Sequence, residues 1–167
     1  FMNSQAGYQD NMGDLGTYDA NKAKSMLTSD GFTMGSDGYL TKGGKTLEVQ
    51  FVIPAGYQSS KNEGELFQAM MKAIGVKVDI KTVPSNDLFD KWIIPGNYDV
   101  APFSWLGTPF PISSGISIWE SPKAGGGQNF TGIANPQIDK LLKQAVATPD
   151  TSQANALVQQ ADKLLYQ

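Results

Sequence analysis

The sequence of 167 residues contains no cysteine, no histidine and no arginine. Without cysteine and histidine, soft-metal sites built on thiolates or imidazoles are excluded, as are nucleophile systems that depend on either residue. Without arginine, no side chain can make a planar, two-pronged contact with a phosphate or a carboxylate. The remaining carboxylates, hydroxyls, amides and aromatic rings favour a binding surface over an active site. We therefore expect that the protein is not an enzyme and that it holds neither a cofactor nor a metal.

The charge of the chain is low and slightly negative. Thirteen lysines oppose 16 carboxylates, which gives a formal charge of −3 and a pI near 4.8. Because the lysines are scattered, nucleic acid is not an expected partner. No run of 18 apolar residues occurs, so no membrane-spanning helix is predicted.

The first residues give no targeting signal. The sequence opens with Phe-Met-Asn, which is neither an initiator methionine nor a basic and apolar leader. The absence of cysteine suits a reducing cytosol and an exported bacterial protein equally. We therefore expect a piece of a longer chain, whose localisation has to be inferred from other features.

The length suits a single domain, and the hydrophobic pattern predicts an α/β fold. Residues 47–53 and 76–82 alternate like strands, and residues 61–74 between them have the spacing of an amphipathic helix. This order predicts a βαβ unit with parallel strands and a right-handed crossover. Four apolar residues of the helix are predicted to face the core: Leu66, Met70, Ala73 and Ile74.

Before this unit we expect an extended lead-in over residues 1–18, a helix over residues 20–29 capped by Asp19, and a short hairpin around Tyr39 and Leu40.

After the unit, Ser85 is expected to cap a helix that ends near Ile93, and residues 98–105 form a third, apolar strand in the middle of a covered sheet. Further helices are predicted over residues 113–118, from Asn135-Pro136, and from Asp150 or Thr151. In the second of these, four residues are expected to face inward: Ile138, Leu141, Leu142 and Ala145.

Two short motifs have ordinary explanations. Gly43-Gly44-Lys45-Thr46 ends like a phosphate-binding loop, but Tyr39 stands where such a loop needs glycine, and the Lys-Thr pair enters a strand instead of a helix. A turn before an edge strand is the simpler interpretation. Asn129-Phe130-Thr131 matches a glycosylation sequon, a three-residue pattern that recurs by chance.

Two pairs of carboxylates could be proposed as acid–base groups, Asp87 with Asp90 and Glu63 with Glu65. Each pair lies on a predicted exposed helix face, where solvation is the usual explanation. We therefore expect no catalytic residue.

The candidate binding segment follows the third predicted strand, because ligands of α/β sheets collect beyond the carboxyl ends of strands. Trp105 offers a stacking plane, Gly107 allows close approach of a backbone, and Thr108 supplies a hydroxyl. The same tryptophan could equally cap the core, and the sequence leaves both interpretations open. The candidate ligand-binding residues are Phe103, Trp105, Leu106, Gly107, Thr108 and Phe110.

Four blocks of sequence resemble segments of a known family, the oligopeptide/dipeptide class (family 5) of ABC-transporter solute-binding proteins. In order they span nearly the whole chain, and the lead-in and the segment after Trp105 resemble an actinobacterial branch. The blocks are residues 18–24 with Leu27 and Gly31, residues 73–78, residues 97–101 with Trp105, and residues 132–142.

The resemblance implies that residues 1–167 are one lobe, the C-terminal one, of a type II periplasmic-binding-protein fold that closes on its ligand by a hinge. It implies an extracytoplasmic protein, lipid-anchored at the cell surface or periplasmic, that delivers a peptide or another polar solute to ABC permease subunits. Its membrane contact would come only through an anchor outside these residues. The alternative is a regulatory or scaffolding lipoprotein of the cell envelope, of the mannolipid-assembly type, that reuses the same fold.

Two positions depart from the family's pattern. In peptide binders of this class, the residue three after the strand-end tryptophan is an aspartate that pairs with the ligand's α-ammonium, whereas this chain has Thr108. Some relatives have an arginine three residues before the tryptophan, whereas this chain has Pro102. A neutral hydroxyl cannot replace a charge-assisted contact typically worth about 1.5–3 kcal/mol. Trp105 carries over as a cleft-wall residue. We expect either that charged recognition comes from the other lobe or that the ligand is neutral where it meets this one.

Overall fold

The computed structural model describes residue 1 and residues 3–166. These residues form two compact units. The first, Tyr18–Ser104, is called the sheet unit below. The second combines Phe1–Thr17 with Trp105–Gln167 and is called the helical unit. Among the described residues, no helix has both the length and the apolar character needed to cross a membrane.

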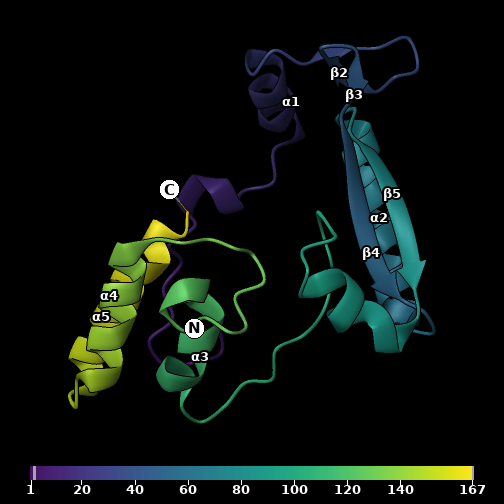
Figure 1. The fold of residues 1–167 in the computed structure, drawn as a ribbon. Helices are drawn as coiled ribbons and strands as arrows, with labels where there is room; N and C mark the ends of the chain where they lie inside the picture. Colours follow the sequence, from purple (N-terminus) through teal and green to yellow (C-terminus); the bar gives the residue numbers. More distant parts are fainter. Residues whose placement is uncertain (2, 167) are drawn as a thin grey trace. The chain divides into compact units, whose positions relative to one another are not determined.

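The centre of the sheet unit is the predicted βαβ motif (Figure 1). Strand β4 (Glu48–Pro54) pairs in parallel with β5 (Lys77–Val83), and helix α2 (Gln58–Ala73) connects them. The parallel pairing and the crossover helix confirm the prediction. Three buried strand residues form the core, and partly buried side chains from α2, from β5 and at Val100 pack against it: Phe51, Ile53 and Val78, with Phe67, Met71, Ile80 and Val100.

The predicted inward face of α2 is wrong for three of its four residues. Leu66 is 61% exposed and Met70 52%, and Ala73 is also exposed, whereas Ile74 is buried as predicted. The helix instead presents Gly64, Phe67 and Met71 to the sheet. A Cβ at position 64 would lie 3.4 Å from the Phe51 ring, so the missing side chain allows this part of the helix to approach the strand closely.

The start of the sheet unit follows its local signals. Helix α1 (Ala20–Ser29) is capped by the Asp19 carboxylate, which accepts a hydrogen bond from the Lys22 backbone N–H at 2.8 Å. Three short antiparallel strands follow in the order β1 (Thr33–Met34), β2 (Leu40–Lys42) and β3 (Lys45–Thr46). Gly43 and Gly44 turn between β2 and β3 with positive φ, the conformation of a tight hairpin. The Gly-Gly-Lys-Thr sequence therefore forms the turn and the second strand of a β-hairpin, as the simpler interpretation predicts.

The segment after β5 is helical and ends at Ile93 as predicted, but it is not a regular α-helix and Ser85 does not cap it. It forms a 3-10 turn, Ser85–Asp87, followed by a single π-helical turn, Leu88–Ile93. Leu88 and Ile93 are buried in it.

The predicted third strand over residues 98–105 is also wrong, apart from one bridge between Phe51 and Val100. At this bridge Val100 donates its N–H to Gln50 O and accepts from the Val52 N–H. A continuing parallel ladder would next need N–H groups from residues 102 and 54, and both are proline. The pairing therefore ends after one residue, and the following residues have no regular secondary structure.

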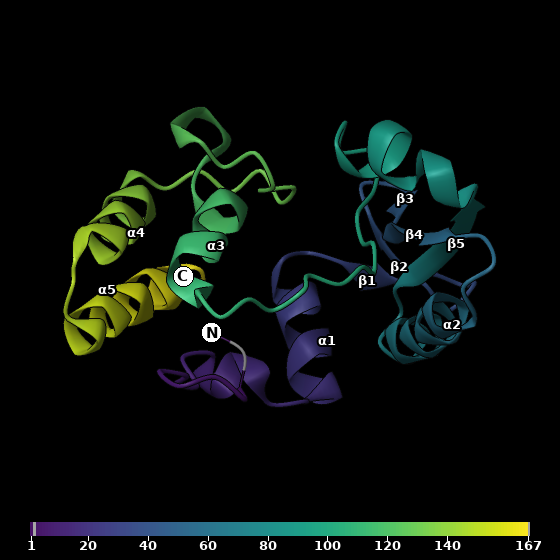
Figure 2. The same cartoon turned by 90° about the horizontal axis from the view of Figure 1, so that it is seen from below.

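The helical unit is built on α4 (Pro136–Ala147) and α5 (Thr151–Leu164), which lie side by side, with α3 (Pro111–Trp119) against them (Figure 2). Asn135 caps α4 and Asp150 caps α5, as predicted. All four residues predicted to face inward from α4 are buried. The core combines residues of the three helices with Leu165: Ile138, Leu141, Leu142 and Ala161, with Ile116, Leu157, Leu164 and Leu165.

The lead-in contains a 3-10 turn, Gly13–Gly16, and is attached to α5. The Asn11 side chain donates to Asp162 Oδ2 at 2.7 Å, and the Gln159 side chain donates to Gly7 O. Tyr166 follows the end of α5. Burial, and then the negative charges of Asp162 and Asp10, raise the pKa of its hydroxyl.

Candidate functional site

Trp105 lies in the helical unit, in a segment without regular secondary structure that leads into α3. Its indole stacks on the Phe130 ring, with ring centroids 5.8 Å apart and planes 13° from parallel. The side chain is 40% exposed. A core cap would be more deeply buried, and the role of Trp105 as a binding wall stays a prediction.

Thr108 shapes the entry into α3. Its hydroxyl donates to Ser114 Oγ at 2.9 Å and accepts from the Phe110 N–H at 3.2 Å. Ser114 Oγ in turn donates to Phe110 O at 3.0 Å. Pro111 follows at the start of the helix, where its missing N–H costs no intrahelical bond. These hydroxyls fix the backbone on which Phe110 is mounted.

Next to this turn the helical unit has a pocket of about 510 Å³, a size typical of small-ligand sites. Its walls come from the lead-in near Ala6, from residues 108–113, and from the connection between α4 and α5 around Pro149. None of the described residues that line it has a charged side chain; its polar groups are hydroxyls and the amides of Gln5 and Asn155. Such a surface suits an uncharged part of a ligand, because a desolvated charge would find no partner on it.

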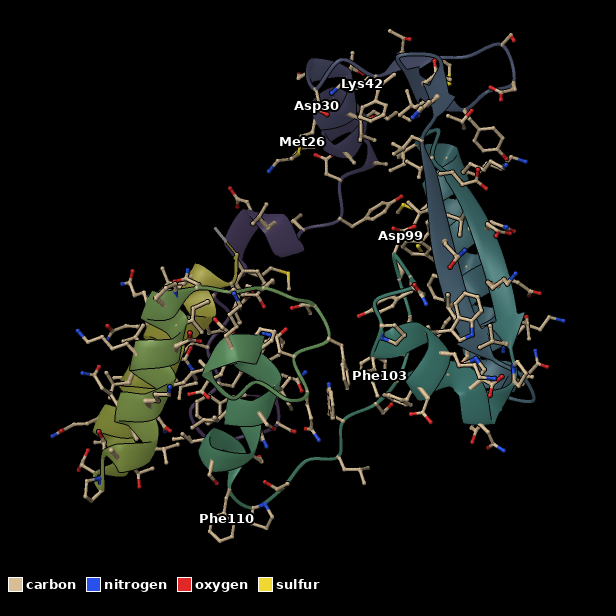
Figure 3. The ribbon with its side chains drawn as sticks, in the orientation of Figure 1. Met26, Asp30, Lys42, Asp99, Phe103 and Phe110 are labelled. Carbon is tan, nitrogen blue, oxygen red and sulfur yellow. The ribbon has the colours of Figure 1, made fainter. Side chains whose placement is uncertain are left out.

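The six candidate residues are divided between the two units. Thr108 and Phe110 line the pocket, and Phe110, which is 73% exposed, projects from the start of α3 (Figure 3). Leu106 is 90% exposed, and Gly107 is exposed beside it. Phe103 belongs to the sheet unit, where its ring meets Phe89 edge-on with centroids 5.5 Å apart.

Sequence reasoning missed Phe130, the ring that stacks on Trp105. The only local signal was the sequon-like Asn129-Phe130-Thr131, which marks the residue without indicating its contact.

Two of the four carboxylates considered as acid–base groups, Asp87 and Glu65, take part in surface ion pairs. Asp87 pairs with Lys91 at 3.0 Å and Glu65 with Lys61 at 3.8 Å, each four positions apart. Within the described part of the chain, no cluster of three or more His, Cys, Asp or Glu residues could hold a metal ion.

Known proteins resemble this chain over most of its length. Residues 1–127 match the family described as bacterial extracellular solute-binding proteins, family 5 middle region. The oligopeptide-binding protein OppA of Mycobacterium tuberculosis is 32% identical over 166 residues, which are 99% of this chain and 27% of that protein. This chain thus spans about a quarter of the length of that relative.

Two solved structures show the same fold. The periplasmic EDTA-binding protein EppA superimposes with a TM-score of 0.84 at 25% identity, over 99% of this chain and 30% of that one. The oligopeptide-binding protein AppA from Bacillus subtilis, solved with a nonapeptide, gives 0.78 at 26% identity, over 89% of this chain and 30% of that one. These matches give no support to the alternative of a regulatory envelope lipoprotein.

Proposed function

This chain belongs to family 5 of the bacterial extracellular solute-binding proteins, and we propose that it is part of the extracytoplasmic binding component of an ABC importer. The family and the α/β architecture predicted from the sequence are both confirmed. Its similarity to binding proteins, together with the surface ion pairs of Asp87 and Glu65, supports a role without catalysis.

The proposed ligand is a peptide, or another polar solute, that is uncharged where it meets these residues. The observation that carries this proposal is the segment from Trp105 to Phe110. It supplies a half-exposed indole and brings Thr108 and Phe110 to a pocket lined by uncharged side chains. A stacked ring and a few hydroxyls can hold the backbone or an apolar side chain of a peptide without a charged clamp.

The remaining elements of the proposal come from the family. Residues 1–167 would belong to one lobe of a two-lobed protein, and the ligand would be enclosed when the lobes close. The protein would work outside the cytoplasm, periplasmic or held at the cell surface by an anchor beyond these residues, and would deliver its solute to permease subunits.

A chelator such as EDTA is the competing ligand, because the likeness to the EDTA-binding protein EppA covers 99% of this chain. EDTA carries several negative charges, and its binding requires cationic groups close to it. The chain has no arginine, and the described lining of the pocket contains no lysine. The surface therefore favours a neutral peptide over a polyanionic chelate.

The test is a thermal-shift and calorimetry series on the intact protein. Its ligands are peptides of three to nine residues with free or acetylated amino termini, neutral oligosaccharides, and EDTA. At 100 times Kd a ligand adds about 2.7 kcal/mol to the free energy of unfolding, a shift of about two degrees in the melting temperature of a protein four times the length of this chain. We expect uncharged peptides to give this shift and EDTA to give none.

Two results would reject the proposal. If EDTA stabilises the protein and none of the peptides or oligosaccharides does, the protein binds a chelator and not a peptide. No shift with any of these ligands, together with no co-purified solute in native mass spectrometry, would argue against transport. Trp105→Ala should weaken the binding, whereas Trp92→Phe, in the sheet unit beside Lys81, serves as the matched control.

A further inference from the structure

The sequon-like triplet Asn129-Phe130-Thr131 is an internal organising motif of the loop between α3 and α4. Asn129 is only 8% exposed. Its amide nitrogen, the atom that would carry a glycan, donates to Glu120 O at 2.8 Å and to Ile133 O at 2.9 Å. Both amide hydrogens are thus used inside the loop, and the group is not available as a glycosylation acceptor in the folded chain.

The amide oxygen of Asn129 completes the arrangement. It accepts from Thr131 Oγ1 at 2.8 Å and from the Gly132 N–H at 3.2 Å. The Thr131 hydroxyl also accepts from the Ile133 N–H at 3.2 Å. One side chain therefore fixes the backbone on both sides of residue 130, and its full hydrogen-bonding capacity is used.

Phe130 lies at the centre of this fixed loop, and its ring is the surface on which Trp105 stacks. Trp105 comes from a segment with no helix or strand, so no backbone ladder orients its indole. The stack supplies an orientation that the local backbone does not. Its offset, nearly parallel geometry is one of the favoured arrangements of aromatic pairs.

We infer that Phe130 is a positioning residue for ligand recognition. It holds the Trp105 indole ready to stack against an uncharged aromatic or proline ring of the ligand, and Asn129 fixes Phe130 for this purpose. The ligand part of this inference rests on the proposed function. A wall that is ordered before binding lowers the entropy lost when the ligand arrives.

The first test needs no ligand. In the intact protein, Trp92→Phe and Trp119→Phe leave Trp105 as the only tryptophan of this chain. Any tryptophan elsewhere in the intact protein is replaced in the same way. On this background, Phe130→Leu should increase quenching of the indole fluorescence by acrylamide and reduce its near-ultraviolet circular dichroism. Phe130→Tyr, which keeps the ring, should restore both signals, and Asn129→Asp should resemble Phe130→Leu.

The second test measures affinity for one defined probe, the blocked peptide acetyl-Ala-Ala-Phe-Ala-Ala-amide. Phe130→Leu should weaken its binding by about threefold to tenfold, which corresponds to the usual worth of an aromatic pair. Phe130→Tyr should bind like the wild type. The matched control is Phe67→Leu in the sheet unit. It removes a ring whose centroid lies 5.1 Å from that of the Phe51 ring. It should lower the melting temperature without changing the affinity.

The outcomes separate this inference from the proposed function. If Phe130→Leu leaves the fluorescence and dichroism of Trp105 unchanged, the positioning role is wrong whether or not a peptide binds. If these signals change but the probe binds as tightly as before, the role in recognition is wrong. If the wild type binds no peptide at all, the proposed function fails, while the fluorescence result still decides whether Phe130 positions Trp105.

Discussion

The backbone N–H of Gln50 donates a hydrogen bond of 2.8 Å to Asp99 Oδ2, across 49 positions of sequence. In a continued parallel ladder this N–H would bond to the carbonyl of residue 98, so the aspartate side chain takes the place of a backbone acceptor. Figure 3 shows Asp99 on the chain beside β4. This contact gives a physical role to the aspartate in the family-like block over residues 97–101.

Asp99→Ala should therefore destabilise the chain by about 1–2 kcal/mol, since a hydrogen bond to a charged group is lost and the Gln50 N–H keeps only water as a partner. Urea denaturation measures the change. Asp79→Ala removes an exposed carboxylate of the same charge on β5 and should cost less than about 0.5 kcal/mol. Equal losses in the two variants would mean that net charge, and not the bond to Gln50, causes the effect.

Features with local causes were predicted well from the sequence. The caps Asp19, Asn135 and Asp150 act within three residues of themselves. The inward face of α4 follows directly from the spacing of its apolar residues.

Features with distant causes were not predicted. The orientation of α2 depends on the close approach of Gly64 to Phe51, and the early end of the third strand depends on Pro54 and Pro102, neither of which can donate the next hydrogen bond of the ladder. The Phe130 ring stacks on Trp105, 25 positions earlier in the chain, from an irregular loop that has no periodicity to recognise. In each case the deciding partner is distant in sequence, and local patterns do not identify it.

Gly126 lies directly against the end of α3, and its replacement should be poorly tolerated. A Cβ there would lie 1.8 Å from Glu120 O, a backbone atom that cannot move aside. Gly126→Ala should thus destabilise by about 1–3 kcal/mol or more. Gly127→Ala, where a Cβ would meet nothing within 4 Å, is the neighbouring control and should be near neutral. Thermal denaturation of both variants decides the point, and a neutral Gly126→Ala would contradict the close packing of this loop.

Glu120 is a buried carboxylate, 3% exposed, whose Oε1 lies 3.8 Å from Lys143 Nζ on α4. Lys143→Met removes this cation and leaves the buried charge uncompensated, so we expect the free energy of unfolding to fall by about 1–3 kcal/mol. The effect is limited because the lysine side chain is more than half exposed and solvent screens the pair. Glu120→Gln in the same background removes the charge and should recover most of the loss. A double-mutant cycle by urea denaturation measures the coupling, and additive effects would show that the pair does not interact.

The family resemblance implies that Thr108 occupies the position where peptide binders of this class have an aspartate for the ligand's α-ammonium, and an aspartate can be introduced there. The partners of the hydroxyl suit a carboxylate too: the Phe110 N–H at 3.2 Å donates, and Ser114 Oγ at 2.9 Å can do so. Thr108→Asp should therefore fold, and it should favour peptides with a free amino terminus over acetylated ones by about tenfold to a hundredfold. Calorimetry on the intact protein measures this preference, and it should shrink as salt is added.

The control is the neutral variant Thr108→Asn, which should show no preference for a free amino terminus. If Thr108→Asp shows none either, residue 108 does not face the amino terminus of the ligand. If the wild type already prefers free amino termini tenfold, a carboxylate other than one at position 108 recognises the ammonium.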